Sequence, residues 1–160
     1  TDFTRHILVN GEAVKAFDRA GALPVMSVQP DRQATLKRLI KQLRANNNAE
    51  ESTAIIGKSL ADCRKLSEEL NEAGVKATLI QSENQRLAPG VIIVPSFLAK
   101  GLEFDAVIVW EASKKNYHDD DERQLLYTIC SRAMHQLTVL ATGKLSPLFG
   151  TVPEDEYVKE

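Results

Sequence analysis

Two short apolar runs separated by a polar bend constrain this chain more than any other feature of its sequence. The runs are Val91–Val94 and Ala106–Trp110, and both are rich in β-branched residues. Such runs are typical of strands that are buried on both faces of a sheet. The bend between them carries Lys100, Gly101 and Glu103, so a glycine with a permissive backbone lies between opposite charges. We therefore expect functional chemistry in this bend.

The rest of the chain alternates predicted strands with predicted helices. Further strands are predicted over 25–28, 53–56, 76–80 and 137–141, and helices over 3–17 (broken at Asn10-Gly11), 31–44, 60–73 and from the acidic run 119–122 onward. This alternation favours an α/β fold in which helices cover both faces of a parallel sheet. Ligands of such folds gather at the carboxyl ends of the strands, so we expect the loop after Val94 to lie at that edge.

Length and composition suit one globular domain, or two small ones. At 160 residues and 43% hydrophobic content the chain can bury a core, which we assign to residues 1–149, and residues 150–160 are expected to be a flexible acidic tail. Twenty basic and twenty-two acidic residues give a net charge of −2, so a contact with nucleic acid must come from a local patch. Cys63 and Cys130 have no CxxC spacing, and there is no signal peptide, which predicts a cytoplasmic protein with reduced thiols.

Three other features have competing interpretations. The basic residues of the 31–44 helix (Lys37, Arg38, Lys41 and Arg44) form either a solvated face, which we favour, or a stripe that contacts phosphates. Gly57-Lys58-Ser59 imitates the end of a Walker A loop, but Ser52 holds the first glycine's place, so no P-loop is predicted. Lys58 is nevertheless a candidate phosphate contact. His118 beside three Asp residues does not predict a metal site, because acids are favoured at a helix amino terminus in any case.

The central bend resembles motif V of the UvrD/Rep/PcrA helicases of superfamily 1, which reads Thr-x-His-x-x-Lys-Gly-Leu-Glu-Phe/Trp before an apolar strand. The segment 100–105, Lys-Gly-Leu-Glu-Phe-Asp, matches closely. A second segment, 122–133, resembles motif VI, Glu-x-x-Leu-x-Tyr-Val-x-x-Thr/Ser-Arg-Ala, through Tyr127, Ser131, Arg132 and Ala133. The two motifs follow one another at about the interval seen in that family, so the ordered pair is more specific than either alone.

The resemblance implies the second RecA-like domain of a helicase motor, a three-layer P-loop NTPase-type fold that lacks its own P-loop. In that family two such domains enclose ATP with Mg²⁺, which is bound mainly by the N-terminal domain. Carried over by position, Gly101 and Glu103 would line the nucleotide and Arg132 would be the catalytic arginine finger. Motif IV, which supplies another arginine in the family, would either precede Thr1 or have been lost. We therefore expect the chain to be a fragment of a larger ATP hydrolase, inactive alone.

Departures from motif V concern nucleic acid. Pro95 and Phe97 hold the places of the Thr and His that touch single-stranded DNA in the family, with Ser96 between them. Phe97 either packs in the core, which we favour, or stacks on a base. The candidate nucleic-acid contacts are thus Lys58, Ser96 and Phe97. This pattern is similar to the HelD and helicase IV branch, which implies RNA polymerase as an alternative partner to DNA.

Overall fold

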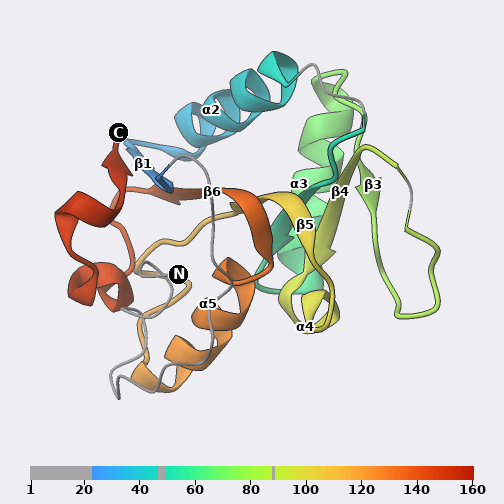
Figure 1. Cartoon of the computed structure of the whole chain (residues 1–160). Coiled ribbons are helices and arrows are strands. Elements are labelled where there is room, and N and C mark those ends of the chain that lie inside the picture. The colour runs from blue at the N-terminus through green and yellow to red at the C-terminus, as the bar shows by residue number, and fades with distance from the viewer. Residues whose placement is uncertain (1–22, 47–49, 88) are drawn as a thin grey trace.

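Seven parallel strands from the described residues form one sheet at the centre of the molecule. The computed structural model describes residues 23–46, 50–87 and 89–160 (Figure 1), so the helix predicted over 3–17 lies outside the described residues. The strand order is β3-β4-β2-β5-β6-β1-β7, and each strand is parallel to its neighbours. The strands are β1 (Val25–Gln29), β2 (Thr53–Gly57), β3 (Thr78–Leu79), β4 (Val91–Pro95), β5 (Phe104–Val109), β6 (Ala133–Thr142) and β7 (Val158–Lys159).

Helices cover both faces of this sheet, which confirms the predicted three-layer arrangement. They are α2 (Arg32–Ala45) and α3 (Leu60–Glu72) on one face, α4 (Ser96–Ala99) and α5 (Arg123–Cys130) on the other, with the 3₁₀ turns η1 (Asp120–Glu122), η2 (Pro147–Thr151) and η3 (Glu154–Glu156). Figure 1 shows α2 and α5 on opposite sides of the sheet. Along β2, Ile55 packs in the core under α2 and α3, whereas Ala54 and Ile56 pack in the other core. Successive strand residues point to opposite faces, which explains why the central strands are apolar throughout.

Side-chain caps stabilise the starts of α2 and α3. The Asp31 carboxylate accepts the N–H of Ala34 at 2.8 Å, and the Ser59 hydroxyl accepts the N–H of Asp62 at 3.1 Å. Each cap satisfies a backbone donor that has no partner within its helix. Ser59 is therefore a helix cap, and because β2 extends to Gly57, the residues before it form a strand, not a phosphate-binding loop.

The parallel arrangement gives the sheet an amino edge and a carboxyl edge. Phe104, the first residue of β5, is paired with Ala133, the first residue of β6. Gly57, the last residue of β2, is paired with Pro95, the last residue of β4. The connection from β4 to β5 therefore starts at the carboxyl edge and returns to the amino edge within residues 96–103.

The C-terminal residues pack against the sheet, so the expectation of a flexible tail over 150–160 is wrong. Val158–Lys159 pair with β1 as the edge strand β7. The Glu160 N–H donates to the Met26 carbonyl at 2.8 Å, and its carboxylate accepts a hydrogen bond from Arg38 Nε at 2.8 Å. Composition missed this strand because backbone pairing at a sheet edge needs no apolar run.

Candidate functional site

The bend that resembles motif V and Arg132 of the motif VI segment lie against each other at the amino edge of the sheet. The backbone N–H of Phe104 donates to the Arg132 carbonyl at 2.9 Å. In addition, Nη1 of Arg132 donates to the carbonyl of Leu102 at 3.4 Å. Segments thirty residues apart in the sequence thus form one site, held by both backbone and side-chain hydrogen bonds.

Arg132 is partly buried, and oxygen acceptors hold its guanidinium in place. Nε donates to the Thr128 carbonyl at 3.1 Å and Nη2 donates to the Ser131 hydroxyl at 3.2 Å, in addition to the bond to Leu102. A guanidinium has five N–H donors. These three bonds therefore leave two N–H donors, one on each terminal nitrogen. An oxyanion can accept hydrogen bonds from both.

The helix before Arg132 is anchored by its buried side. Leu126, Ile129, Cys130 and Ala133 are fully buried and Leu125 is partly buried, so this side of α5 packs in the core. Tyr127 of motif VI is also buried. Burial raises the pKa of its hydroxyl, and the nearby positive charge of Arg132 opposes that rise. Arg132 itself lies in the turn between α5 and β6, not within the helix.

Gly101 and Glu103 leave the bend open on the solvent side. Gly101 has a φ of 83°, and a Cβ there would meet no atom within 4 Å, so the backbone angle, not lack of space, requires glycine. Glu103 is exposed and makes no hydrogen bond or ion pair with any residue that the structure describes. Its carboxylate is therefore available to a ligand.

The expected position of this site at the carboxyl ends of the strands is wrong. Ser96, at the start of the β4–β5 connection, and Lys58, directly after β2, lie there. Glu103 and Arg132 immediately precede β5 and β6, so they lie at the amino edge. The sequence could not reveal this, because residues 96–103 run from the carboxyl edge to the amino edge of the sheet in a connection that is shorter than most βαβ crossovers.

Asp105 is a residue of this edge that sequence reasoning missed. Its carboxylate Oδ2 accepts the N–H of Ser52 at 2.8 Å and the Ser52 hydroxyl at 3.1 Å, while the Asp105 N–H donates back to Ser52 Oγ at 2.9 Å. His135 Nε2 lies 3.6 Å from the other carboxylate oxygen. Asp105 therefore joins the starts of β2 and β5, next to the bend that carries Glu103.

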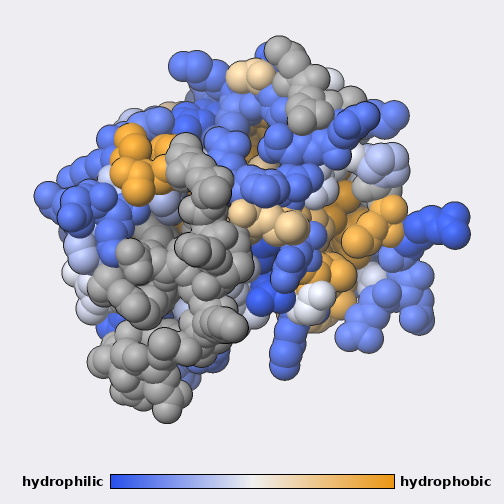
Figure 2. Space-filling view, in the orientation of Figure 1, coloured by the Kyte–Doolittle hydropathy of each residue, from blue (hydrophilic) through white to orange (hydrophobic). Residues whose placement is uncertain are grey.

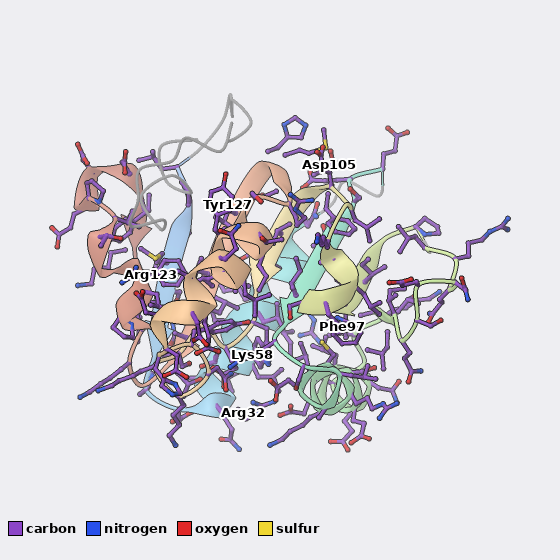
Figure 3. All side chains as sticks on the ribbon, turned by 90° about the horizontal axis from the view of Figure 1, so that it is seen from below. Arg32, Lys58, Phe97, Asp105, Arg123 and Tyr127 are labelled. Atoms are coloured by element: carbon purple, nitrogen blue, oxygen red, sulfur yellow. The ribbon has the colours of Figure 1, made fainter. Side chains whose placement is uncertain are left out.

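Lys58 lies at the opposite, carboxyl edge of the sheet and is already paired, so its ammonium is not free to bind a phosphate. Figure 3 shows Lys58 and Asp105 at opposite ends of the molecule. The Lys58 ammonium forms an ion pair with Glu122, donates to the Asn116 carbonyl and lies 5.3 Å from the centre of the Tyr117 ring. Burial would raise the pKa of Glu122, but its hydrogen bonds to Lys58 and to two backbone N–H groups lower it to about 2. A phosphate would have to displace this carboxylate.

The environments of Ser96 and Phe97 are the reverse of those expected, a surface contact for Ser96 and the core for Phe97. Ser96 is buried, and its hydroxyl donates to the Lys58 carbonyl at 2.7 Å, so it is not available to nucleic acid. Phe97 is 60% exposed, so the favoured core packing of this ring is wrong. Its neighbours explain the difference, because Ala99 is buried and Leu98 is partly buried, leaving Phe97 on the outer side of α4 (Figure 3).

A second polar cluster at the carboxyl edge was also missed. Glu111 follows β5 with a φ of 54°, a left-handed conformation that is uncommon for a residue other than glycine. Its carboxylate accepts hydrogen bonds from Thr142 Oγ1 at 2.7 Å and from Arg32 Nη1 at 3.4 Å. Arg32 also pairs with Glu69 and lies 5.4 Å from the Trp110 ring. Arg32 pairs with both carboxylates, so the cluster holds α2, α3 and the end of β5 together.

Comparisons with known proteins place these observations in a family. Residues 90–140, which include the bend and all of α5, match the family described as UvrD-like helicase C-terminal domain. The structure of the C-terminal domain of a possible DNA helicase from Lactobacillus plantarum WCFS1 is 55% identical, covers 99% of this chain and 92% of that chain, and has a TM-score of 0.87. The chain belongs to the UvrD-like helicase C-terminal domain family.

More distant structures share only the fold with this helicase C-terminal domain. Arterivirus nonstructural protein 10, a helicase, is 13% identical over 99% of this chain and 36% of its own, with a TM-score of 0.52. The E. coli DEAD-box protein SrmB is 15% identical over 86% of this chain and 89% of its own, with a TM-score of 0.53. These matches agree with a RecA-like arrangement. No curated protein matches the chain significantly.

The two cysteines of this helicase domain are free and buried, and burial raises the pKa of Cys63 to about 12. No helix in the described part of the chain is long and apolar enough to cross a membrane. Within residues 23–46, 50–87 and 89–160, His, Cys, Asp and Glu side chains form no group of three that could hold a metal ion.

Proposed function

We propose that this chain is the second motor domain of an ATP-dependent DNA helicase or translocase, and that it supplies half of an ATP site. Glu103 and Gly101 would line the nucleotide, and Arg132 would contact the γ-phosphate. The other half, which binds most of the ATP and its Mg²⁺, would belong to an N-terminal RecA-like domain. Alone, this domain would not hydrolyse ATP, because the strand before Ser59 leaves no phosphate-binding loop there.

The observation that carries this proposal is the contact between Arg132 and the bend. The Leu102 carbonyl and the Phe104 N–H hold Arg132 beside Glu103, although the two motifs are far apart in sequence. A fixed guanidinium with two remaining N–H donors fits a phosphoryl group, whereas an unpaired carboxylate fits the hydroxyl groups of a ribose. The residues present therefore suit the two ends of a nucleoside triphosphate.

The proposed role of Arg132 is electrostatic stabilisation of the transferred phosphoryl group. During phosphoryl transfer, negative charge spreads over the equatorial oxygens of the γ-phosphate, and a guanidinium aimed at them stabilises that charge. Because Arg132 is already held by three acceptors, little rearrangement is needed when the charge develops. Such an arginine contributes about 10³–10⁵ to the rate in comparable enzymes.

The test is Arg132→Ala in the full-length parent, with ATP turnover as the readout. We expect turnover to fall by about three orders of magnitude or more. Arg132→Lys should not restore it, because an ammonium cannot donate as a planar fork. The matched control is Arg123→Ala at the start of α5, since Arg123 pairs with Asp120 and the Leu148 carbonyl, away from the bend.

Thermal unfolding of each variant separates a lost catalytic group from a lost fold. Unchanged ATP turnover in a folded Arg132→Ala protein would remove the arginine-finger role. Glu103→Gln provides a second test of the same site. It should weaken ATP binding without a comparable loss of turnover at saturating ATP, because a ribose contact is made equally before and during the reaction.

A second candidate function is a HelD-like module in which ATP drives release of RNA polymerase from nucleic acid. The observation that favours it is Phe97, an exposed aromatic ring where motif V carries a DNA-contacting histidine. Capture of polymerase by the parent, with and without DNA, distinguishes the two. If Phe97→Ala abolishes capture of polymerase but not DNA binding, the remodelling function is favoured. The reverse result favours a motor on DNA whose bases stack on Phe97.

A further inference from the structure

Helix α2 concentrates positive charge in a chain whose net charge is negative. Its fourteen residues include five cations and no carboxylate, whereas the whole chain has a net charge of −2. The cations are Arg32, Lys37, Arg38, Lys41 and Arg44. Figure 2 shows hydrophilic residues over much of the surface above α2, at the top of the view.

Two of the five cations have structural partners. Arg32 pairs with Glu69 and Glu111, as described above. Arg38 pairs with Glu160 and also donates to the side chain of Gln42 at 2.8 Å. These two side chains hold α2 to its surroundings, so they are not available to a partner.

The other three cations are exposed and lack an anionic partner. Lys37, Lys41 and Arg44 form no ion pair with any carboxylate among the described residues, although the charge of Lys41 contributes to the lowered pKa of Glu160. Arg44 makes one hydrogen bond, to the Ala73 carbonyl at 3.3 Å. Like charges three and four residues apart destabilise a helix by about 0.2–0.5 kcal/mol per pair, so an anion that binds all three would relieve this repulsion.

The three cations form one side of a shallow groove, which we call the α2 groove. With Ile40 and Ala73 they line a volume of about 440 Å³ between α2 and the end of α3. Their spacing of i, i+4 and i+7 places them on one face of the helix. At a rise of 1.5 Å per residue, the line from Lys37 to Arg44 is about 10 Å long. It can therefore face several consecutive phosphates of one strand.

We propose that the α2 groove binds the phosphate backbone of nucleic acid. Three of its five lining residues are cations, and its apolar floor consists only of Ile40 and Ala73. An acidic amphipathic peptide would need a longer apolar stripe to anchor its side chains. A phosphate backbone needs only exposed cations at regular spacing, which this groove provides.

The α2 groove is separate from the proposed ATP site. Helix α2 packs in the core on one face of the sheet, whereas α5 and Arg132 belong to the other face. Binding in the α2 groove therefore requires neither ATP nor Arg132. Contacts to phosphates carry no sequence information, so the α2 groove acts as a non-specific holding site for a strand.

The experiment measures binding of the 160-residue chain to a fluorescent mixed-sequence single strand and to the matching duplex, over a series of salt concentrations. The triple variant Lys37→Ala/Lys41→Ala/Arg44→Ala should lose roughly tenfold or more in affinity at low salt. The slope of log affinity against log salt should become shallower by about two, because each phosphate contact contributes about 0.7–0.9. Lys65→Ala/Lys114→Ala/Lys115→Ala, which removes three exposed cations elsewhere, is the matched control.

The triple variant removes exposed side chains, the repulsion between their like charges and the exposed hydrogen bond from Arg44 to the Ala73 carbonyl, so its melting temperature should change little. Equal affinity and equal salt slope for the wild type and the folded triple variant would overturn the proposal, as would an equal loss in the control. Binding of a polyglutamate peptide by the wild type, without binding of either nucleic acid, would also overturn it in favour of an acidic protein partner. The binding assay does not involve ATP. Its outcome is therefore independent of the outcome of the ATPase test on Arg132→Ala.

Discussion

At the scale of single residues, Gly57 is required by a close contact with Cys63. A Cβ on Gly57 would lie 2.7 Å from the Cys63 sulfur, which is closer than side chains normally approach. We predict that Gly57→Ala lowers the free energy of unfolding by about 1–3 kcal/mol, as overpacking of a core usually does. Chemical denaturation of the purified chain measures this change.

The double variant Gly57→Ala/Cys63→Ala is the control for that contact. Removing the sulfur makes room for the new methyl group, so the double variant should be more stable than the sum of the two single effects predicts. Additive effects would mean that the 2.7 Å contact does not cause the loss of stability in Gly57→Ala.

Tyr117 provides a second test at this scale. Its ring is fully buried, and its hydroxyl has no hydrogen-bond partner among the residues that the structure describes. An unpaired buried hydroxyl costs free energy, so Tyr117→Phe should leave the stability unchanged or raise it by about 1 kcal/mol. A marked loss of stability in urea denaturation would show that the hydroxyl has a partner, such as a buried water.

At the scale of elements, the Lys58–Glu122 ion pair connects the end of β2 to the start of α5. The Glu122 carboxylate also accepts the N–H groups of His118 and Asp119, at 3.1 and 3.0 Å, so it closes the turn η1 that precedes the helix. The Glu122 pKa is lowered to about 2 from its usual 4.5. A lowered carboxyl pKa contributes stability above the usual value, and this contribution is lost as the pH falls through the folded-state pKa.

We therefore predict that Glu122→Gln destabilises the protein at pH 7 and that the difference from the wild type shrinks between about pH 4.5 and 2. Thermal unfolding across this pH range gives the measurement. Asp121→Asn, an exposed neighbour in the same acidic run, is the matched control and should change the melting temperature little at any pH. A constant difference between Glu122→Gln and wild type across the range would contradict the prediction.

At the scale of the whole molecule, the last three residues complete the sheet. Backbone bonds from Val28 to Glu160 and from Glu160 to Met26 continue the pairing of β7 with β1, and Arg38 attaches the same end to α2. We predict that deletion of Val158, Lys159 and Glu160 lowers the melting temperature. A domain of this size loses about 2–4 °C for each kcal/mol of stability.

Glu160→Gln is the control for this deletion, because it removes only the charge and leaves the strand. It should cost much less than the deletion, since exposed ion pairs contribute about 0–1 kcal/mol. If the deletion left the melting temperature unchanged, these residues would not be part of the folded sheet. An equal loss in both variants would assign the effect to the ion pair instead.

The features that could be predicted are those encoded within a few neighbouring residues. The apolar strands predicted over 91–94 and 106–110 and the helices predicted over 31–44 and 60–73 depend on local spacing, and the structure contains each of them. Phe97 and Lys58 were misjudged because their environments depend on distant elements. Phe97 is exposed because its neighbours on α4 take the buried positions, and Lys58 is neutralised by Glu122, sixty-four positions later in the sequence.

By itself, the sequence determined a parallel α/β fold and two motifs of a helicase motor, because hydrophobic periodicity and short motifs are local properties. Only the tertiary structure decided where those motifs meet. Hydrogen bonds between Arg132 and the 102–104 segment form across adjacent strands, and the short β4–β5 connection brings them to the amino edge. The pairing of strands and the path of a crossover depend on contacts between distant residues, which no local pattern contains.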